Sequence, residues 1–483
     1  MKKYILFLLP LFLGLLVSND IEAKKKKYPN GDRYEGEWKD GVPNGNGKMT
    51  YASGGIYIGN WLSGNKHGEG KMTYANGDCY EGNWSYNNKQ GNGKMTYTSG
   101  DIYIGNWASD NKHGNGKTTY ANGDCYEGNW NLGKRKGIGT MTYANGNCYK
   151  GNWEDGHYDG NGIMKYANGD VYEGEYVKGK REGFGVYTFS DGEKYEGQWY
   201  QDQQHGKGIF YFMNNNRYDG MWYQDYQHGK GTMYYYNGDL YEGDWVNDKR
   251  EGQGTYTWKN GSKYVGSWKD DKKNGKGSLV WNDGCKYEGH WKNDVRDGKG
   301  TFEYANGDKY VGDWKEDMQH GKGIYFFHTG DRYEGSYVQG ERTGEGIYYH
   351  ASGNKYVGNF KNGMQEGRGT FTWASGAVYD GEWKDNQRNG YGVYKWNVGD
   401  SYEGEWKDNK FNGQGTLILT DGTKYKGGFV NGLEEGSGVQ EDKNGNRYEG
   451  FFKQGKKDGP FVETDKNGKL VRKGTYKMGR LSN

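Results

Sequence analysis

Aromatic and glycine residues recur along the chain at a fixed interval of 23 positions. Tyrosine stands at Tyr34 and at every 23rd residue from there to Tyr448, nineteen times without an insertion or deletion. Glycine follows each tyrosine after two residues, and four residues after it stands tryptophan in fourteen copies and tyrosine or phenylalanine in five. Glycine also stands 11 residues after every tyrosine and 13 residues after all but the last. A period of this length is the signature of a repeat architecture.

Each 23-residue copy is predicted to form one β-hairpin. Polar and apolar residues alternate over two runs per copy, which is the pattern of a half-buried strand. A polar linker such as Lys39–Asn44 separates the runs, and Asn-Gly or Ser-Gly precedes the next tyrosine; both favour turns. We therefore expect an all-β fold, an elongated single-layer antiparallel sheet of tandem hairpins in which each hairpin contacts only its neighbours. About 38 strands spaced by roughly 4.8 Å would give a rod on the order of 180 Å long.

The alternation also predicts two different faces. Because side chains alternate across a strand, the tyrosine, the glycine two residues later and the aromatic residue four residues later share one face. The positions at 11, 13 and 17 are expected on the same face of the second strand, whereas the other face carries polar residues such as Glu35 and Lys48. Glycine weakens a strand, so we expect it here to leave room for an aromatic ring to lie on the backbone. In the first and tenth copies this structural signature consists of Tyr34, Gly36, Trp38, Gly45, Gly47, Tyr51, Tyr241, Gly243, Trp245, Gly252, Gly254 and Trp258.

Composition supports an ordered but unusual core. A mean hydropathy of -1.19 by itself indicates disorder, yet the chain has 47 Tyr, 18 Trp and 89 Gly, and disordered segments are poor in aromatic residues. The apolar surface is therefore aromatic rather than aliphatic. The formal net charge of +2 gives no global reason to expect a nucleic acid or an anionic membrane as the partner.

The N-terminus has the form of a secretory signal. Basic residues precede an apolar run over 4–17, and Ile21–Ala23 is a plausible cleavage site ending in a small residue. The run is short for a membrane span. Lys24–Lys27 follow the cleavage point, where positive charge hinders export. We expect a cleaved signal and an exported protein (periplasmic, secreted or on the cell surface), with an uncleaved membrane anchor as the alternative.

The repeat weakens toward the C-terminus. Asp442 replaces the aromatic residue of its copy and Phe461 replaces the second glycine. Residues 453–483 contain nine Lys or Arg against three acidic residues, which suits a terminal cap that protects the sheet edge with charge. A basic contact patch is the alternative. The predicted organisation is a signal peptide at 1–23, nineteen hairpin repeats at 24–461, and a degenerate repeat forming a basic cap at 462–483.

Four cysteines occur, and we expect all of them to be free thiols. Cys79, Cys125 and Cys148 occupy the same position in different copies. Equivalent positions one copy apart are separated by two strand spacings, roughly 10 Å, and a disulfide needs Cα atoms within about 7 Å.

The unit Tyr34-Glu35-Gly36-Glu37-Trp38-Lys39-Asp40-Gly41, with its Gly-x-Gly pair and Tyr51, resembles the MORN repeat. The resemblance covers residues 31 to about 461, and the tail resembles the divergent variant of this repeat found in bacterial proteins. It implies single-layer antiparallel hairpin arrays that serve as scaffolds, bind partner proteins and have been proposed to bind phospholipid head groups. Some members carry phosphoinositide kinase domains, but no kinase sequence occurs here.

No motif indicates catalysis. Gly116-Lys117-Thr118 is similar to the end of a phosphate-binding loop, but Asn111 stands where the first glycine is required, so it is predicted to be ordinary strand. Histidines at one linker position are expected roughly 10 Å apart, too far to share a metal ion; they are His67, His113, His205, His228 and His320. No nucleophile stands beside a base. We expect no enzyme activity, catalytic residue, metal or cofactor, and the sequence does not identify ligand-binding residues.

Three classes of function fit these observations. The first is a scaffold at the cell envelope that binds a protein partner or associates with itself. The second is a membrane or phospholipid-binding module, which the basic ends favour and the near-neutral net charge disfavours. The third is a binder of cell-wall glycans or choline-type ligands, because aromatic hairpins can form cation-binding cages. The aromatic face is expected to be core, with a binding groove as the alternative. Nucleic acid is not expected as a partner.

Overall fold

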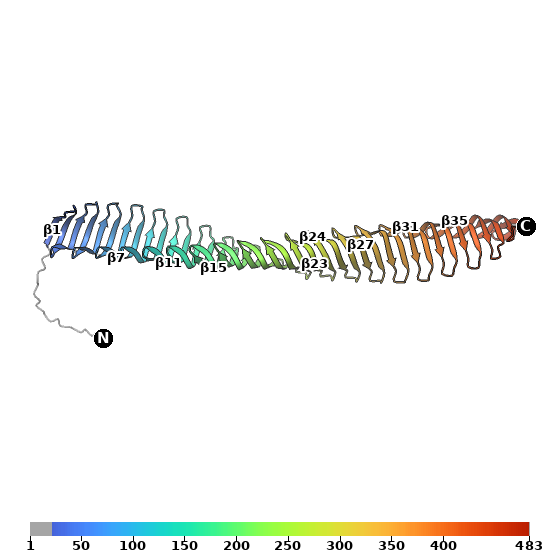
Figure 1. Cartoon of the computed structure of the whole chain (residues 1–483), viewed down its shortest axis with the longest axis horizontal. Coiled ribbons are helices and arrows are strands. Elements are labelled where there is room, and N and C mark those ends of the chain that lie inside the picture. Colours follow the sequence, from blue (N-terminus) through green and yellow to red (C-terminus); the bar gives the residue numbers. More distant parts are fainter. Residues whose placement is uncertain (1–21, 483) are drawn as a thin grey trace, which may run out of the picture. The chain divides into compact units, whose positions relative to one another are not determined.

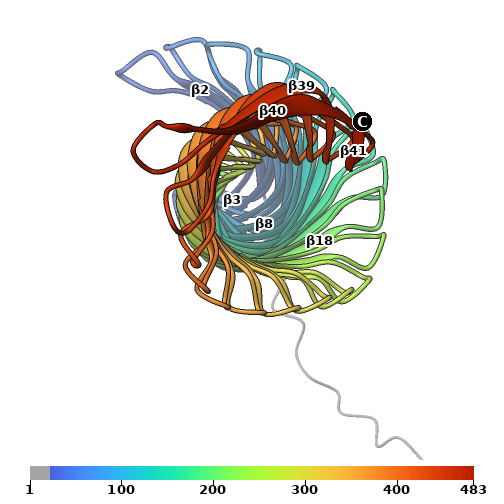
Figure 2. The same ribbon diagram turned by 90° about the vertical axis from the view of Figure 1, so that its right-hand side faces the viewer.

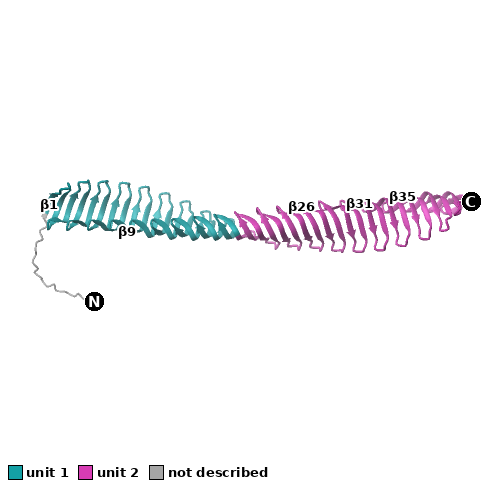
Figure 3. Ribbon diagram, in the orientation of Figure 1, with its two compact units in different colours: residues 1–229 teal, residues 230–483 magenta. Residues whose placement is uncertain are grey.

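The computed structural model describes residues 22–482, and these form β-strands and the turns between them, without helices. They divide into two compact units, residues up to Gly229 and residues from Lys230, which Figure 3 colours separately. The boundary falls within β19 (Tyr226–Tyr234). No helix capable of crossing a membrane is found in the described part of the chain. The predicted signal peptide lies outside the described residues except for Glu22 and Ala23, which begin the first strand.

Unit 1 contains the first eighteen strands, which Figure 1 labels in part. They are β1 (Glu22–Lys27), β2 (Arg33–Lys39), β3 (Val42–Thr50), β4 (Ile56–Leu62), β5 (Asn65–Thr73), β6 (Cys79–Ser85), β7 (Asn88–Thr96), β8 (Ile102–Ala108), β9 (Asn111–Thr119), β10 (Cys125–Asn131), β11 (Lys134–Thr142), β12 (Cys148–Glu154), β13 (His157–Lys165), β14 (Val171–Val177), β15 (Lys180–Thr188), β16 (Lys194–Tyr200), β17 (Gln203–Tyr211) and β18 (Arg217–Tyr223).

Unit 2 continues the same alternation of seven-residue and nine-residue strands. They are β20 (Leu240–Val246), β21 (Lys249–Thr257), β22 (Lys263–Lys269), β23 (Lys272–Val280), β24 (Lys286–Lys292), β25 (Val295–Glu303), β26 (Lys309–Lys315), β27 (Met318–Phe326), β28 (Arg332–Val338), β29 (Glu341–Tyr349), β30 (Lys355–Lys361), β31 (Met364–Thr372), β32 (Val378–Lys384), β33 (Gln387–Lys395), β34 (Ser401–Lys407), β35 (Lys410–Ile418), β36 (Lys424–Val430), β37 (Leu433–Glu441), β38 (Arg447–Lys453), β39 (Lys456–Thr464), β40 (Leu470–Lys477) and β41 (Arg480–Ser482).

Within each unit, consecutive strands pair antiparallel and no second layer covers the sheet. Seen along its long axis, the sheet of each unit turns progressively from hairpin to hairpin (Figure 2). This is the twist that antiparallel strands adopt when nothing flattens them. The prediction of an all-β, single-layer array of tandem hairpins is confirmed. Strand pairing also continues into the predicted degenerate repeat, where β39 pairs with β40 and β40 with β41.

The turn inside each hairpin is shorter than the sequence predicts. The polar linker Lys39–Asn44 was expected to be the turn, but β2 ends at Lys39 and β3 begins at Val42. Only Asp40 and Gly41 connect them, with φ angles of 52° and 82°. Two central residues with positive φ form the tight turn whose twist matches that of antiparallel strands. The polar residues that follow are therefore part of the second strand.

Two of the glycines in each copy have different roles. Gly243 pairs with Gly254, whereas Trp245 pairs with Arg250, so β21 has two more residues than β20 between these pairs. Gly252 lies in this bulge with a φ of +80°, a conformation that costs residues with a Cβ atom. Gly45 has a φ of +90° at the same place in the first copy. The expectation that this glycine makes room for a ring is thus wrong, since it permits the bulge.

The other glycines form a continuous row across the strands. In β20 to β23 this row pairs Gly243 with Gly254, Gly254 with Gly266, and Gly266 with Gly277. One strand after another contributes one glycine, because the 23-residue period places both glycines in register. Near the C-terminus Phe461 takes the place of a glycine and stacks on Tyr448, with ring centroids 5.3 Å apart.

Candidate functional site

The aromatic rings form a ladder inside the sheet. The Tyr241 ring meets Trp245 of its own hairpin at 5.2 Å and Trp268 of the next hairpin at 5.3 Å, both edge to face. Tyr241 is 0% exposed and the two tryptophans are 3% and 5% exposed. Edge-to-face pairs at this separation are favourable beyond the area that they bury. The signature tyrosines and tryptophans therefore make up the core, as the alternation predicts.

The glycine row provides the space in which each tyrosine ring lies. A Cβ atom added to Gly243 would come 2.5 Å from the Tyr241 hydroxyl oxygen and 2.6 Å from Gly254 Cα. A Cβ atom on Gly254 would overlap the Tyr241 ring itself. The ring belongs to the same hairpin as the glycines on which it lies, and its hydroxyl donates to Asp244 O at 3.1 Å. Tyr34 lies on Gly36 and Gly47 in the same way, and burial raises the pKa of the Tyr34 hydroxyl to about 12.

A backbone contact joins each hairpin to the next. The Trp268 indole Nε1 donates to Gly254 O at 3.2 Å, and the same contact recurs along both units. Tyr51 and Trp258, the signature residues 17 positions after the tyrosine, are half-buried at the start of the turn between hairpins. The Trp258 amide donates to Ser262 O at 2.9 Å, so this residue also closes the turn. All twelve signature residues have structural roles of this kind.

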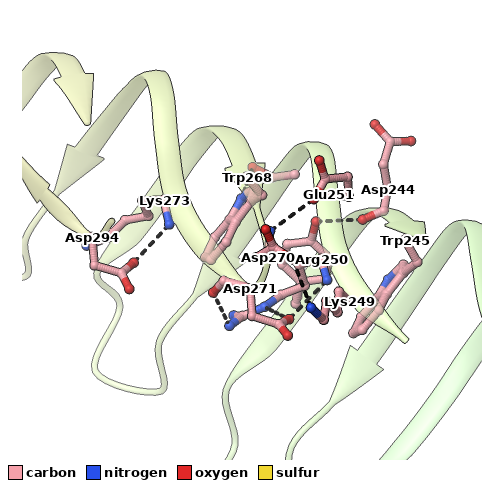
Figure 4. Close-up of polar contacts among 12 residues, drawn as sticks. Asp244, Trp245, Lys249, Arg250, Glu251, Trp268, Asp270, Asp271, Lys273 and Asp294 are labelled. Atoms are coloured by element: carbon pink, nitrogen blue, oxygen red, sulfur yellow. Dashed lines mark hydrogen bonds and ion pairs between the residues drawn. The ribbon is translucent and has the colours of Figure 1, made fainter. Parts of the chain in front are cut away.

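A cation lies over the tryptophan of the next hairpin in many copies. Arg250 Cζ is 4.4 Å from the Trp268 ring centroid and 5.6 Å from those of Tyr241 and Tyr256. The guanidinium is held there by Asp271, with Nε 3.1 Å from Oδ1 and Nη2 donating to the backbone oxygen at 2.7 Å (Figure 4). A cation over an aromatic face is attracted by the quadrupole of the ring. Arg250 therefore connects two consecutive hairpins.

Lysine takes the same position in other copies. Lys112 Nζ lies 4.7 Å from the Trp130 centroid, 4.8 Å from Tyr103 and 5.5 Å from Tyr97. Burial lowers the pKa of Lys112 because the charged ammonium is partly removed from water. In these copies the aromatic cage is occupied by a side chain of the protein itself. This occupancy counts against the expectation of a choline-type ligand on the aromatic face.

The sequence contains a signal for this cation that we did not use. Lysine or arginine stands nine residues after the repeat tyrosine in eleven of nineteen copies. Because the other copies have Pro, Tyr, Gln, Phe or Glu there, the position looks variable until its neighbours in space are known. The eleven are Lys66, Lys89, Lys112, Arg135, Arg181, Arg250, Lys273, Arg296, Arg342, Arg388 and Lys457.

Aspartates connect the turns between successive hairpins. Asp308, 9% exposed, accepts hydrogen bonds from the His328 amide at 2.7 Å and from the Tyr325 hydroxyl at 2.9 Å. His328 Nδ1 lies 2.8 Å from the same carboxylate. Burial by itself raises the pKa of Asp308, but the hydrogen bonds from His328 and Tyr325 outweigh it and lower the pKa to about 2.

This depressed pKa predicts a loss of stability in acid. A carboxylate with a lowered folded-state pKa stabilises the fold above its ordinary value of 3.8, and this contribution disappears as the pH falls toward 2. We expect Asp308→Asn to lower the free energy of unfolding by about 2 kcal/mol at pH 7. Thermal unfolding of both proteins should show this difference shrinking between pH 4 and pH 2. A difference that stays constant over this range would contradict the role given to the carboxylate.

The opposite face is polar and carries grooves along the glycine row. In unit 1 a groove of about 740 Å³ is bordered by Ile58, Lys71, Asn83 and Ile104. In unit 2 a groove of about 570 Å³ runs between Lys299 and Lys322 on one side and Val311 and Ile324 on the other. Because glycine has no side chain, the residues on either side of the row stand above it as walls. This polar face is the accessible surface on which a partner can lie.

The sequence motifs that suggested chemistry have structural positions. Thr118 is buried on the aromatic face of β9, and Lys117 faces the other side, 3.6 Å from Glu127. His205 lies between the rings of Tyr200 and Tyr223, with centroids 5.5 and 5.4 Å apart. Among residues 22–482, no three His, Cys, Asp or Glu side chains are grouped to hold a metal ion. The four cysteines are half-buried free thiols, as predicted.

Comparison with known proteins gives one extensive match. The sequence profile described as MORN repeat matches nineteen consecutive segments, from residues 34–56 to 448–468. No curated protein matches the chain.

Solved structures with some similarity include two proteins of the same kind and one enzyme. The TCP10 domain of Danio rerio CPAP in complex with a STIL peptide is 13% identical over 55% of this chain and 96% of its own, with a TM-score of 0.19. The Drosophila melanogaster SAS-4 TCP domain is 16% identical over 46% of this chain and 90% of its own, with a TM-score of 0.12. Virginiamycin B lyase from Staphylococcus aureus is 11% identical over 58% and 90%, with a TM-score of 0.11.

Proposed function

Because the chain belongs to the MORN repeat family, we propose that it is a non-enzymatic scaffold that binds a protein partner through the polar face of its sheet. We further propose that it is exported and acts at the cell envelope, on the strength of the signal-like sequence at residues 1–23. A long array with the same unit in every copy offers an extended surface rather than one reactive spot.

The observation that carries this proposal is the burial of the aromatic ladder. The residues with the greatest capacity for ligand binding, the tyrosines and tryptophans, are used inside the sheet, and in many copies cations cover the tryptophans. What remains accessible is a face of Lys, Glu, Asn and scattered apolar side chains. Protein interfaces combine apolar contacts with a polar rim, and such a mixture suits a protein partner better than a uniformly charged surface.

Two measurements test the proposal in the native host. Fractionation and N-terminal sequencing should place the protein outside the cytoplasm with Lys24 as its first residue. Affinity capture after cross-linking should recover a protein whose cross-links map to polar-face lysines such as Lys299. A cytoplasmic protein that retains Met1 would contradict the proposed location. Sedimentation with anionic vesicles, without a cross-linked protein, would favour a lipid-binding module instead.

A further inference from the structure

The groove of unit 2 has walls of different chemistry. One wall carries lysines at the same position of alternate strands, Lys299 in β25 and Lys322 in β27. The other wall carries Val311 and Ile324, with Val311 37% exposed. The floor and remaining border of the groove are formed by Gly300, Thr301, Gly312, Gly323, Glu334 and Gly335. A groove with a basic wall and an apolar wall suits an occupant that is acidic on one side and apolar on the next.

The lysine wall is only partly neutralised within the chain. Lys299 Nζ lies 3.3 Å from Asp313, and the Lys299 side chain is 84% exposed. Lys322 Nζ donates to the Ser336 hydroxyl at 2.8 Å instead of to a carboxylate. Lys276 occupies the equivalent position in β23 and extends the wall. Three lysines therefore face one aspartate, and the excess positive charge attracts carboxylates.

The spacing of the lysines selects the conformation of the occupant. Successive wall lysines are two strands apart, which corresponds to roughly 9.6 Å. A polyproline II segment has three residues per turn and rises about 3.1 Å per residue, so every third side chain recurs after roughly 9.3 Å. A segment lying along the groove in this conformation would place each third residue opposite a lysine. A β-strand in the same direction repeats at about 6.6 Å and loses this register.

We propose that this groove binds an extended, polyproline II-like segment of a partner protein with an acidic residue at every third position and an apolar residue beside it. The acidic side chains pair with Lys276, Lys299 and Lys322, and the apolar side chains lie on Val311 and Ile324. A uniform polyanion fits less well, because Asp313 and Glu334 border the same surface. This inference rests on the proposed scaffold function and names the chemistry of the partner.

Binding of a defined peptide to the full chain tests the inference. The probe is a fluorescein-labelled peptide of four Pro-Val-Glu units, measured by fluorescence anisotropy at about 150 mM salt, where charges more than roughly 8 Å apart are largely screened. The double variant Lys299→Glu, Lys322→Glu should bind at least tenfold more weakly than the parent. Val311→Thr, which keeps the shape and removes apolar contact, should weaken binding about threefold.

Matched controls separate the groove from general charge. Lys384→Glu, Lys407→Glu changes the charge of the same face by the same amount on β32 and β34, at least five strands from β27. This variant should bind the peptide within twofold of the parent. A peptide of the same composition with its glutamates in one block should bind at least fivefold more weakly, since it has lost the three-residue spacing.

Other outcomes would overturn the inference. Equal losses for the two double variants, or equal binding of the block peptide, would show that charge alone is recognised. Binding of polyphosphate or anionic vesicles as tight as that of the peptide would identify a polyanion or membrane surface instead. If the peptide does not bind but host proteins still cross-link to the polar face, the groove assignment fails while the scaffold proposal stands. If neither occurs, both fail.

Discussion

Replacing Gly243 with valine is expected to destabilise its hairpin by about 3 kcal/mol, although valine favours strands. The new Cβ atom would lie 2.6 Å from Gly254 Cα and 2.7 Å from Gln253 O, both in the backbone of the paired strand. A backbone atom cannot turn away as a flexible side chain can, so the two strands must separate. Strand propensity returns at most about 1 kcal/mol, and the clash therefore decides the sign.

The effect should remain local, and amide hydrogen exchange followed by mass spectrometry measures it. Peptides from β20 and β21 should lose protection in the valine variant, whereas peptides several hairpins away should not, because each hairpin contacts only its neighbours. Glu242→Thr, at the exposed adjacent position on the polar face, is the matched control and should be close to neutral. Protection of β20 and β21 at or above the parent level would show that the glycine row does not exist to accommodate the ring.

Deleting one whole repeat is expected to leave a folded protein, whereas deleting half a repeat should abolish correct folding. Removing Tyr126–Cys148 joins Cys125 to Tyr149, and Tyr149 then takes the place of Tyr126 opposite Thr118 of β9. Every later strand keeps its direction and its partner. Removing Tyr126–Lys136 eliminates one strand, so every following strand is reversed and its tyrosines lose their glycine pairs.

Solubility and circular dichroism distinguish the two deletions. The 23-residue deletion should remain soluble and melt within a few degrees of the parent, because it removes one unit of a nearest-neighbour array. The 11-residue deletion should aggregate, since it exposes aromatic rings and unpaired strand edges. Equal solubility and equal melting of both proteins would contradict the hairpin as the unit of folding.

The periodic positions of the sequence were sufficient to predict the fold. Tyr241 and Trp245 lie on one face because they are an even number of residues apart in one strand, and this parity is visible in the sequence. The role of Gly252 was not visible, because a bulge depends on how many residues pair with the opposite strand. Alternation within one strand does not contain that number.

The candidate site was less predictable for a related reason. Arg250 and Lys112 occupy a position that varies in type from copy to copy, and their significance comes from a tryptophan 18 residues later in the next hairpin. The groove between Lys299 and Val311 likewise joins side chains from different strands on either side of a glycine row. Contacts between copies decide both features, whereas the repeat pattern describes what is common within one copy.

The central claim is that the aromatic face is core and the polar face binds the partner, and lysine footprinting tests it most directly. Lysines occur on both faces, with Lys299 and Lys322 on the polar face and Lys112 and Lys273 over the aromatic rings. Acylation of the full chain with and without its cross-linked host partner, read by mass spectrometry, reports the accessibility of each. The account predicts that the partner protects polar-face lysines and leaves the reactivity of Lys112 and Lys273 unchanged. Protection confined to Lys112 and Lys273, with Lys299 and Lys322 still fully reactive, would contradict it.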